Sequence, residues 1–269
     1  ASEITFPPRD YQSRAAPLFW EQGSLLLGDQ VGLGKTGSAI TAMTEKRILP
    51  AVVVVKTHLT KQWKEEVHRF LPLLEIHIIK KMAPYDLPPS DVYIVTFSKL
   101  TAWYATLAEK CQSVIYDEIQ ELRLPGSDKY QAAQTLSARL AFRLGLSATP
   151  IFNYGGEIWN VLNLVCRDAL GTRDEFHREW CTFSGKHAVV QNPDALGAFL
   201  RNNRLMLRRT RKEVGRELQP ITKHVIETGF DKAAYDSGTT AAAELARRML
   251  TGTFLERGQA AREFDLEMR

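Results

Sequence analysis

The sequence has few cysteines and little that points to a secreted or membrane protein. Its 269 residues include only 3 cysteines, Cys111, Cys166 and Cys181, with no Cys-x-x-Cys pair. An odd number at wide spacing predicts neither a disulfide framework nor a zinc site, so we assign all of them to packing. No apolar run approaches the roughly 18 residues of a membrane span, and the first residues lack the basic and apolar regions of a secretory leader. We therefore expect a cytosolic or nuclear protein that is not secreted and has no membrane partner.

The sequence also lacks a strong bias in composition or charge. Hydrophobic residues make up 44% and charged residues 25%, close to the averages of soluble globular proteins, which excludes collagen-like and disordered classes. Lysine and arginine number 35 against 31 acidic residues, so the net charge of +4 permits a polyanionic partner without requiring one. At about 100 to 200 residues per domain, the length corresponds to one large domain or two small ones.

Short β-branched runs alternate with longer amphipathic stretches in the first half of the chain. This alternation is typical of strands joined by crossover helices, and we predict an α/β fold with a central, mostly parallel sheet flanked by helices. Residues 51–55 are apolar at consecutive positions, which indicates a central strand covered on both faces. After Pro150 the sequence favours helices with few strand signals. The strand candidates are residues 24–27, 51–55, 92–96, 114–116 and 144–147, and the helix candidates are 34–47, 59–70 and 130–141.

A glycine-rich segment follows the first strand candidate and precedes a helix candidate, and it reads Gly28-Asp-Gln-Val-Gly-Leu-Gly-Lys-Thr36. Gly32 and Gly34 allow a turn in which consecutive backbone N–H groups face one anion at the start of the helix. Lys35 can then reach the β- and γ-phosphates of a nucleotide, and the Thr36 hydroxyl can bind Mg²⁺. The strict phosphate-loop pattern has its first glycine where this chain has Asp29, so the match is partial.

Two acids follow the strand candidate 114–116. Carboxylates at the carboxyl end of a parallel strand lie at the same sheet edge as a phosphate loop. Asp117 is therefore expected to hold Mg²⁺ directly or through water, and Glu118 to orient and deprotonate the attacking water. Alone, an Asp-Glu pair after a strand is usually a solvated loop or a cap, but the phosphate loop upstream favours the functional interpretation.

Taken in order, these motifs resemble the first RecA-like lobe of the SWI/SNF-like, chromatin-remodeller-type family of superfamily 2 DNA-dependent ATPases and helicases. The resemblance runs from residue 9 to about residue 225, and that family also lacks the first glycine of the phosphate loop. The segments that carry it are Arg9-Asp-Tyr-Gln12, Asp29-Gln-Val-Gly-Leu-Gly-Lys-Thr36, Lys56-Thr-His-Leu-Thr-Lys-Gln-Trp63, Ile94-Val-Thr-Phe-Ser98, Asp117-Glu-Ile-Gln120, Leu144-Gly-Leu-Ser-Ala-Thr-Pro150 with Asn153 and Glu157-Ile-Trp159, and Leu205-Met-Leu-Arg-Arg-Thr-Arg-Lys-Glu-Val214.

The resemblance implies ATP and Mg²⁺ as cofactors and double-stranded DNA, bound without regard to sequence, as the partner. It implies cytoplasmic, nucleoid-associated, or nuclear localisation. The implied ATP-binding residues are Arg9, Gln12, Asp29, Gly32, Leu33, Gly34, Lys35 and Thr36, with Gln12 reading the adenine. The implied catalytic residues are Glu118 and Lys35, the Mg²⁺ ligands are Thr36 and Asp117, and the residues for DNA contact or coupling are Lys56, Thr57, Thr96, Ser147 and Thr149.

Two further segments have simpler structural interpretations. We interpret Trp63 as packing its helix onto the sheet rather than stacking on a base. Residues 201–216 contain seven basic residues and one acid, and leucine spacing favours an amphipathic helix with several arginines outward. We expect this basic segment to lie away from the γ-phosphate, with the alternative that Arg208 or Arg209 folds back toward it.

The family implies a second RecA-like lobe with a Gln-x-x-Gly-Arg-x-x-Arg motif, which this sequence does not contain; Gln259-Ala-Ala-Arg262 does not fit it. We therefore expect residues 1–225 to form the first, ATP-binding lobe and residues 226–269 to begin a helical insertion or linker toward the absent second lobe. The leading hypothesis is the ATP-binding half of a double-stranded-DNA translocase, in which the isolated chain is nearly inactive. The alternatives are a nucleotide-gated interaction module without motor activity, another P-loop NTPase such as a kinase, a restriction-type translocase lobe and a duplex-separating helicase.

Overall fold

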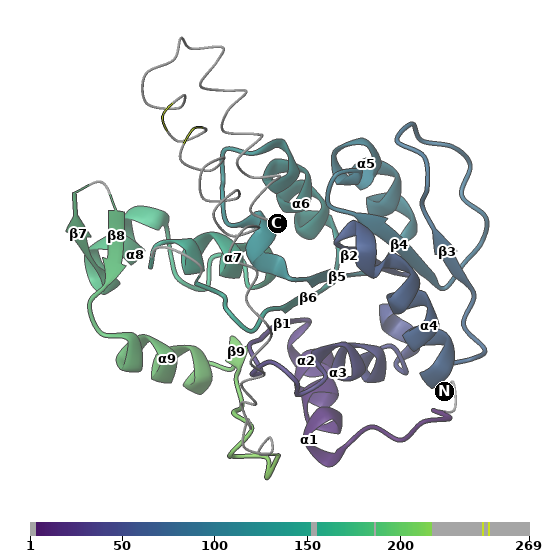
Figure 1. The fold of residues 1–269 in the computed structure, drawn as a ribbon, viewed down its shortest axis with the longest axis horizontal. Coiled ribbons are helices and arrows are strands. Elements are labelled where there is room, and N and C mark those ends of the chain that lie inside the picture. The colour runs from purple at the N-terminus through teal and green to yellow at the C-terminus, as the bar shows by residue number, and fades with distance from the viewer. Residues whose placement is uncertain (1–3, 152–154, 186, 217–243, 245–246, 248–269) are drawn as a thin grey trace. The chain divides into compact units, whose positions relative to one another are not determined.

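Seven strands form one sheet in which every neighbouring pair is parallel (Figure 1). Its order is β3-β4-β2-β5-β6-β1-β9, so the predicted α/β fold with a parallel sheet is confirmed. β2 is an interior strand as expected, although β5 has the middle position. The strands are β1 (Ser24–Leu27), β2 (Ala51–Val55), β3 (Ile76–Ile78), β4 (Val92–Thr96), β5 (Ser113–Asp117), β6 (Phe142–Leu146) and β9 (Met206–Leu207).

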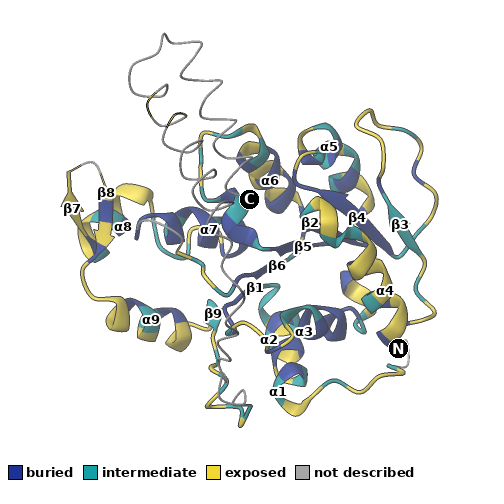
Figure 2. Cartoon of the chain, viewed as in Figure 1, coloured by how far each residue is buried: buried dark blue, intermediate teal, exposed yellow. Residues whose placement is uncertain are grey.

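Consecutive apolar residues in the strands fill two cores, because successive side chains point to opposite faces of a sheet. In β2, Val52 and Val54 belong to one buried cluster, whereas Val53 and Val55 belong to the other. Figure 2 shows the central strands buried along their length, and every residue of β2 has 0% exposure. This double burial is what the unbroken run of residues 51–55 predicts.

Helices cover both faces of the sheet. α2, α3 and α4 supply Phe19, Ile40 and Val67 to one cluster, and α5 and α6 supply Trp103 and Leu136 to the other. The helices are α1 (Asp10–Ser13), α2 (Ala15–Gln22), α3 (Lys35–Ala42), α4 (Thr60–Phe70), α5 (Leu100–Lys110), α6 (Asp128–Arg139), α7 (Glu157–Val165), α8 (Arg173–Trp180) and α9 (Pro193–Asn202). Short 3₁₀ turns are η1 (Lys46–Ile48), η2 (Thr57–Leu59) and η3 (Ile119–Leu122).

The computed structural model describes residues 4–151, 155–185 and 187–216, with Glu244 and Arg247. The chain divides into two compact units, Ala1–Leu218 and Gln219–Arg269. The expected helical extension at 226–269 lies outside the described residues except for Glu244 and Arg247, and so do Asn153 and the segment 259–262. Within the described part of the chain, no helix is long and apolar enough to cross a membrane.

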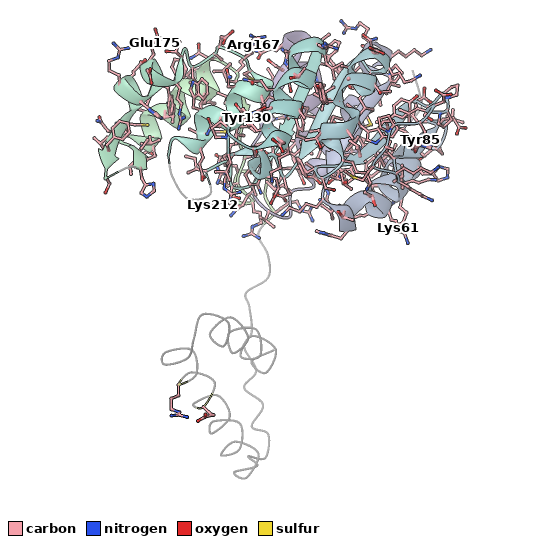
Figure 3. All side chains as sticks on the ribbon, turned by 90° about the horizontal axis from the view of Figure 1, so that it is seen from above. Lys61, Tyr85, Tyr130, Arg167, Glu175 and Lys212 are labelled. Carbon is pink, nitrogen blue, oxygen red and sulfur yellow. The ribbon has the colours of Figure 1, made fainter. Side chains whose placement is uncertain are left out.

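Several elements were not predicted from the sequence. β3 and β9 are 3 and 2 residues long, too short to show a period, and α5 separates β4 from β5. After Pro150 an antiparallel hairpin of β7 (Cys181–Ser184) and β8 (His187–Val190) interrupts the helices. In the first unit, Tyr85, between β3 and β4, and Glu175, in α8 before the hairpin, lie at opposite ends (Figure 3). All 3 cysteines are buried and free, which confirms their assignment to packing.

Candidate functional site

The parallel sheet places five sequence motifs at one edge. Because all strands run in the same direction, their carboxyl ends lie on the same side of the sheet, where crevices between strand ends are the usual ligand sites of such folds. The loop 28–34 follows β1, and Asp117 ends β5. Lys56 follows β2, Thr96 ends β4 and Ser147 follows β6.

The loop after β1 turns sharply into α3. Gly32 and Gly34 have φ of 88° and 70°, in the left-handed region that glycine adopts without strain. Gly34 has a second constraint, because an added Cβ would lie 2.6 Å from the Nε2 atom of Gln12. α3 then begins at Lys35, so its amino-terminal N–H groups open onto the loop. The segment thus has the strand, loop and helix arrangement expected of a phosphate site.

The predicted adenine-recognition element lies directly against this loop. Gln12 is 7% exposed, and its Nε2 donates to the carbonyl oxygens of Leu33 and Gly34 at 3.2 and 3.1 Å. Its Oε1 accepts from the backbone N–H of Arg9 at 3.0 Å, and the Tyr11 hydroxyl donates to Leu33 O at 2.9 Å. Gln12 therefore supports the phosphate loop, while its reading of an adenine remains a prediction.

Lys35 lies among three carboxylates. Its ammonium donates to the backbone carbonyl of Asp29 at 2.8 Å. Burial lowers the pKa of Lys35, and the negative charges of Glu118, Asp29 and Asp117 act in the opposite direction. Because these charges act on one ammonium, the structure brings the lysine of the loop and the acids of β5 into the same electrostatic environment.

The two acids after β5 have different surroundings. Asp117 is 8% exposed, and its Oδ2 accepts a hydrogen bond from the indole N–H of Trp63 at 2.8 Å. Burial raises the pKa of Asp117, and the Trp63 hydrogen bond opposes that shift. Glu118 has a φ of 54°, unusual for a residue with a side chain, and its Oε2 accepts from the amide of Gln120. The backbone therefore turns at Glu118, directly after β5, and enters the 3₁₀ turn η3.

The residues present are suited to Mg²⁺ bound together with a nucleotide. No group of three or more His, Cys, Asp or Glu side chains that could hold a metal alone occurs among the described residues. Mg²⁺ commonly takes one or two carboxylates plus phosphate oxygens and waters, which is a smaller protein donor set. Asp117 supplies a carboxylate, and the half-buried Thr36 has a hydroxyl that donates to none of the described residues.

The basic segment folds back onto the phosphate loop through Arg208 and Arg209, which is the alternative interpretation; that it lies away from a bound γ-phosphate stays a prediction. Arg209 forms an ion pair with the fully buried carboxylate of Asp29, and its Nε and backbone N–H donate to Asp29 Oδ1 at 2.9 and 3.0 Å. It also donates to the carbonyl of Tyr11 and lies over that ring, 5.3 Å from its centroid. Arg208 donates to the carbonyls of Gly28 and Ala148 at 2.8 and 3.1 Å.

A short strand, β9, brings the basic segment back to the phosphate loop. α9 ends at Asn202, and Met206–Leu207 then pairs with β1 as β9, so residues 201–216 are not one amphipathic helix as predicted. Backbone bonds continue the pairing into the loop, from Gly28 N–H to Leu207 O at 2.7 Å and from Gln30 N–H to Arg209 O at 3.0 Å. The sequence motif gave no sign of this because two strand residues carry no periodic pattern.

The residues predicted for DNA contact after β2 are accessible. Thr57 is exposed, and its carbonyl accepts from the Thr60 hydroxyl at 3.1 Å at the start of α4. Lys56 is half-buried and pairs with Glu121 at 3.0 Å, and Lys129 approaches the other oxygen of Glu121 at 3.6 Å. The ion pair between Lys56 and Glu121 thus connects the segment after β2 to η3, the turn that follows the two acids.

The other predicted coupling residues are more enclosed. Thr96 is 3% exposed, and its hydroxyl bonds with that of Ser98 at 2.9 Å, so exposed Ser98 is the more accessible side chain of this segment. Ser147 is fully buried and accepts from the backbone N–H of Thr149 at 3.0 Å, whereas Thr149 is exposed. Ser147 therefore shapes its turn, and Thr149 is the one open to a ligand.

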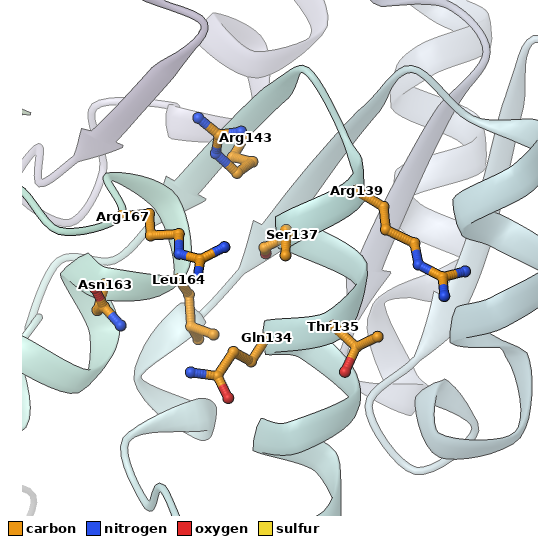
Figure 4. Close-up of a pocket in the computed structure, with 9 residues that line it drawn as sticks. Gln134, Thr135, Ser137, Arg139, Arg143, Asn163, Leu164 and Arg167 are labelled. Carbon is orange, nitrogen blue, oxygen red and sulfur yellow. The ribbon is translucent and has the colours of Figure 1, made fainter.

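A basic cavity of about 400 Å³ lies at the opposite edge of the sheet, near the amino end of β6 (Figure 4). Arg143 lines it and donates to Val165 O at 2.8 Å and Leu140 O at 2.7 Å, at the carboxyl ends of α7 and α6. Cations stabilise helix carboxyl ends, so this arginine has a structural role there. Arg167 pairs with Asp168 at 3.5 Å. The cavity is separate from the candidate site, and its lining residues are Gln134, Thr135, Ser137, Ala138, Arg139, Arg143, Asn163, Leu164 and Arg167.

Comparison with protein-family models matches residues 11–257 to the SNF2-related domain. Similar curated proteins include an uncharacterized ATP-dependent helicase of Mycoplasma genitalium, 26% identical over 205 residues that cover 72% of this chain and 19% of the relative. The Caenorhabditis elegans homolog of SWI/SNF-related matrix-associated actin-dependent regulator of chromatin subfamily A-like protein 1 is 26% identical, covering 76% of this chain and 31% of the relative. The chromatin-remodeling ATPase INO80 of Candida albicans is 27% identical, covering 74% and 16%. The chain thus spans less than a third of the length of these relatives.

Among solved structures, the Sulfolobus solfataricus SWI2/SNF2 ATPase core in complex with double-stranded DNA is similar, with a TM-score of 0.67. The match covers 99% of this chain and 58% of that one at 20% sequence identity, and the same core domain determined separately gives a TM-score of 0.66. This likeness concerns the fold.

Proposed function

Because the chain belongs to the SNF2-related domain family, we propose that it is the ATP-binding lobe of an ATP-dependent double-stranded-DNA translocase or helicase-like ATPase. The observation that supports this most directly is the meeting of Lys35 with Asp117 and Glu118 at one sheet edge, beside a loop whose glycines have left-handed backbones. A lysine, a metal-binding carboxylate and a second acid are the groups that phosphoryl transfer to water requires.

Each residue has a separate role in this proposal. The backbone N–H groups of the loop and the Lys35 ammonium bind the phosphates of ATP, with Arg9 and Gln12 beside the adenine. Asp117 and the Thr36 hydroxyl hold Mg²⁺, which supplies positive charge to the phosphate oxygens when bound. Glu118 orients the attacking water and accepts its proton, and Gln120 holds the Glu118 carboxylate.

The proposal extends to the parts of the protein beyond this lobe. Residues 1–225 form the first RecA-like lobe, and residues 226–269 begin a helical insertion toward a second lobe. DNA binds without regard to sequence along the strand-end segments, at Lys56 and Thr57 and at the turns that carry Thr96, Ser147 and Thr149. The protein works where DNA is, in the cytoplasm with the nucleoid or in the nucleus.

Nucleotide binding is tested by Lys35→Ala. The change removes a charge that pairs with phosphate, and losing such a hydrogen bond costs on the order of 1.5 to 3 kcal/mol. Calorimetric titration with Mg²⁺ and ATP should therefore show an affinity weaker by about 10-fold or more. Lys110→Ala, at the exposed end of α5, is the matched control and should bind as the parent does. Equal affinity in the parent and in Lys35→Ala would reject the site.

DNA binding is tested by fluorescence anisotropy at several salt concentrations. One lobe offers few phosphate contacts, so we expect weak binding that is equal on duplexes of different sequence. Each phosphate contact contributes about 0.9 to the slope of log affinity against log salt, so Lys56→Ala should flatten the slope by about that amount. Lys110→Ala should leave the slope unchanged. Tight binding that discriminates between sequences would count against a translocase.

A further inference from the structure

The hydrogen bond from Trp63 to Asp117 is unlike those of the other tryptophans. Its indole N–H reaches a carboxylate oxygen, Oδ2, across 54 positions of the chain, at 2.8 Å. Trp20, Trp103 and Trp159 donate to backbone carbonyls instead. A buried indole usually finds an acceptor, but here the acceptor is the acid at the end of β5.

Both partners of this bond are held in place. Trp63 is 1% exposed and packs in the cluster between α4 and the sheet, which includes Val53 and Ile115. The sequence-based interpretation of Trp63 as a packing residue is therefore confirmed. Asp117 is itself buried, and hydrogen bonds to charged groups are stronger than neutral ones where water is excluded. A donor fixed by packing thus fixes the rotation of the carboxylate.

We infer that Trp63 is a positioning residue for Mg²⁺: its hydrogen bond to Oδ2 fixes the Asp117 carboxylate in the orientation that presents it to the metal. This inference rests on the proposed ATP site and deepens it. Trp63 itself touches neither nucleotide nor metal. Hydrogen-bond partners that orient metal-binding side chains typically contribute about 10- to 100-fold in metal affinity.

The test measures how much Mg²⁺ strengthens nucleotide binding. A non-hydrolysable ATP analogue is titrated into the chain with Mg²⁺ and with EDTA, and the ratio of the two affinities is the coupling between metal and nucleotide. Trp63→Phe keeps a buried ring but removes the N–H, so this ratio should fall by about 10- to 100-fold, while the affinity in EDTA stays that of the parent. Trp103→Phe is the matched control, because Trp103 is also fully buried but donates to Lys81 O. Its ratio should not change.

The outcomes separate this inference from the proposed function. A full Mg²⁺ effect in Trp63→Phe would overturn the positioning role and leave the ATP site intact. Absence of nucleotide binding by the parent itself would overturn both. If Trp63→Phe does not fold, the parent is labelled with ¹⁵N and the Trp63 indole resonance is identified by replacing the other tryptophans. Adding Mg²⁺ to the analogue complex should then move the Trp63 resonance and not that of Trp103, and an unmoved Trp63 resonance would reject the inference.

Discussion

Asp29 occupies a position that the usual phosphate loop gives to glycine, and Arg209 explains why an acid is tolerated there. Its carboxylate is 0% exposed, and the Arg209 side chain is 13% exposed. An isolated buried carboxylate is costly, so the fork of Arg209 stabilises it through several hydrogen bonds at once. The same arginine contacts Tyr11, next to Gln12. One ion pair thus joins the loop, the first helix and the basic segment.

Replacing Arg209 by Ala should destabilise the chain strongly. The change leaves the Asp29 carboxylate buried without its cation, which typically costs on the order of 3 to 5 kcal/mol. Arg208→Ala is the control, because Arg208 is exposed and donates to backbone carbonyls. Urea unfolding should show a much smaller loss for Arg208→Ala, and adding Asp29→Ala to Arg209→Ala should restore part of the stability. Equal losses for the two arginine variants would contradict the role of this ion pair.

The sequence predicted the loop and the acids of this site but not the residues that hold them. Lys35 and Asp117 follow strands within a recognisable local pattern, and strand direction alone brings them to one edge. The partners of Asp29 and Asp117 are 180 and 54 positions distant, and no local pattern encodes such pairs. Gln12 was assigned to the adenine from the resemblance, and its contacts with the phosphate loop depend on the backbone path of Gly34.

At the level of elements, β1, β2 and β4 were predicted with their observed ends because buried parallel strands are apolar without interruption. β3 and β9 were missed because edge strands of 2 or 3 residues leave no such run. α4 was predicted from its amphipathic pattern, and it also connects two parts of the candidate site. It begins at Thr60, directly after η2 (Thr57–Leu59), and carries Trp63 in its first turn, so one short stretch of chain joins the proposed DNA segment to the carboxylate proposed to bind Mg²⁺.

We expect the edge strand β3 to become less stable at acidic pH because of His77. The ring Nε2 bonds with the Tyr85 hydroxyl at 2.8 Å, and burial, then the charges of Lys64 and Lys80, lower the pKa of His77. Because the folded pKa lies below the unfolded one, the stabilisation from this group is present above the unfolded value and is lost as pH falls through the folded pKa. Amide exchange in residues 76–91, corrected for intrinsic rates, should therefore accelerate as pH falls below about 6.5, the ordinary pKa of a histidine, toward the lowered pKa of the folded ring.

The matched variants for that prediction are both histidine replacements. His77→Gln removes the titrating ring, so the exchange rates of β3 should no longer depend on pH beyond the intrinsic effect. His68→Gln, an exposed position on α4, should retain the parent's dependence. If amide exchange in β3 of His77→Gln still accelerates on acidification as much as it does in the parent, another group is responsible.

At the scale of the whole molecule, the site has a lysine and two acids, while the two arginines that contact the phosphate loop are already engaged. Arg208 and Arg209 lie at the loop, but their hydrogen bonds go to Gly28 O, Ala148 O and Asp29. Phosphoryl transfer needs charge neutralised on the γ-phosphate oxygens, and an arginine supplied by another domain contributes on the order of 10³ to 10⁵ in rate.

We therefore expect this chain alone to bind ATP and turn it over barely above background, and to change little when duplex DNA is added. Steady-state phosphate release with and without DNA measures this. The control is the same assay over a range of protein concentrations, because a second copy that supplied an arginine would make the specific rate rise with concentration. Robust DNA-stimulated release that is independent of concentration would mean that an arginine of this chain completes the site.

The return of the basic segment also joins two distant parts of the chain by a direct contact beside the phosphate loop. Tyr11 and Arg209 are 198 positions apart but bonded directly, so the polypeptide between them forms a ring fastened at the phosphate loop. A pull on the backbone beyond Arg216 would first load β9 and the Arg209 to Asp29 bond, before any strand in the middle of the sheet. Under the proposed function, tension arriving from the following part of the protein would thus be delivered to the loop proposed to bind the nucleotide, and nucleotide release would be the first step that it affects.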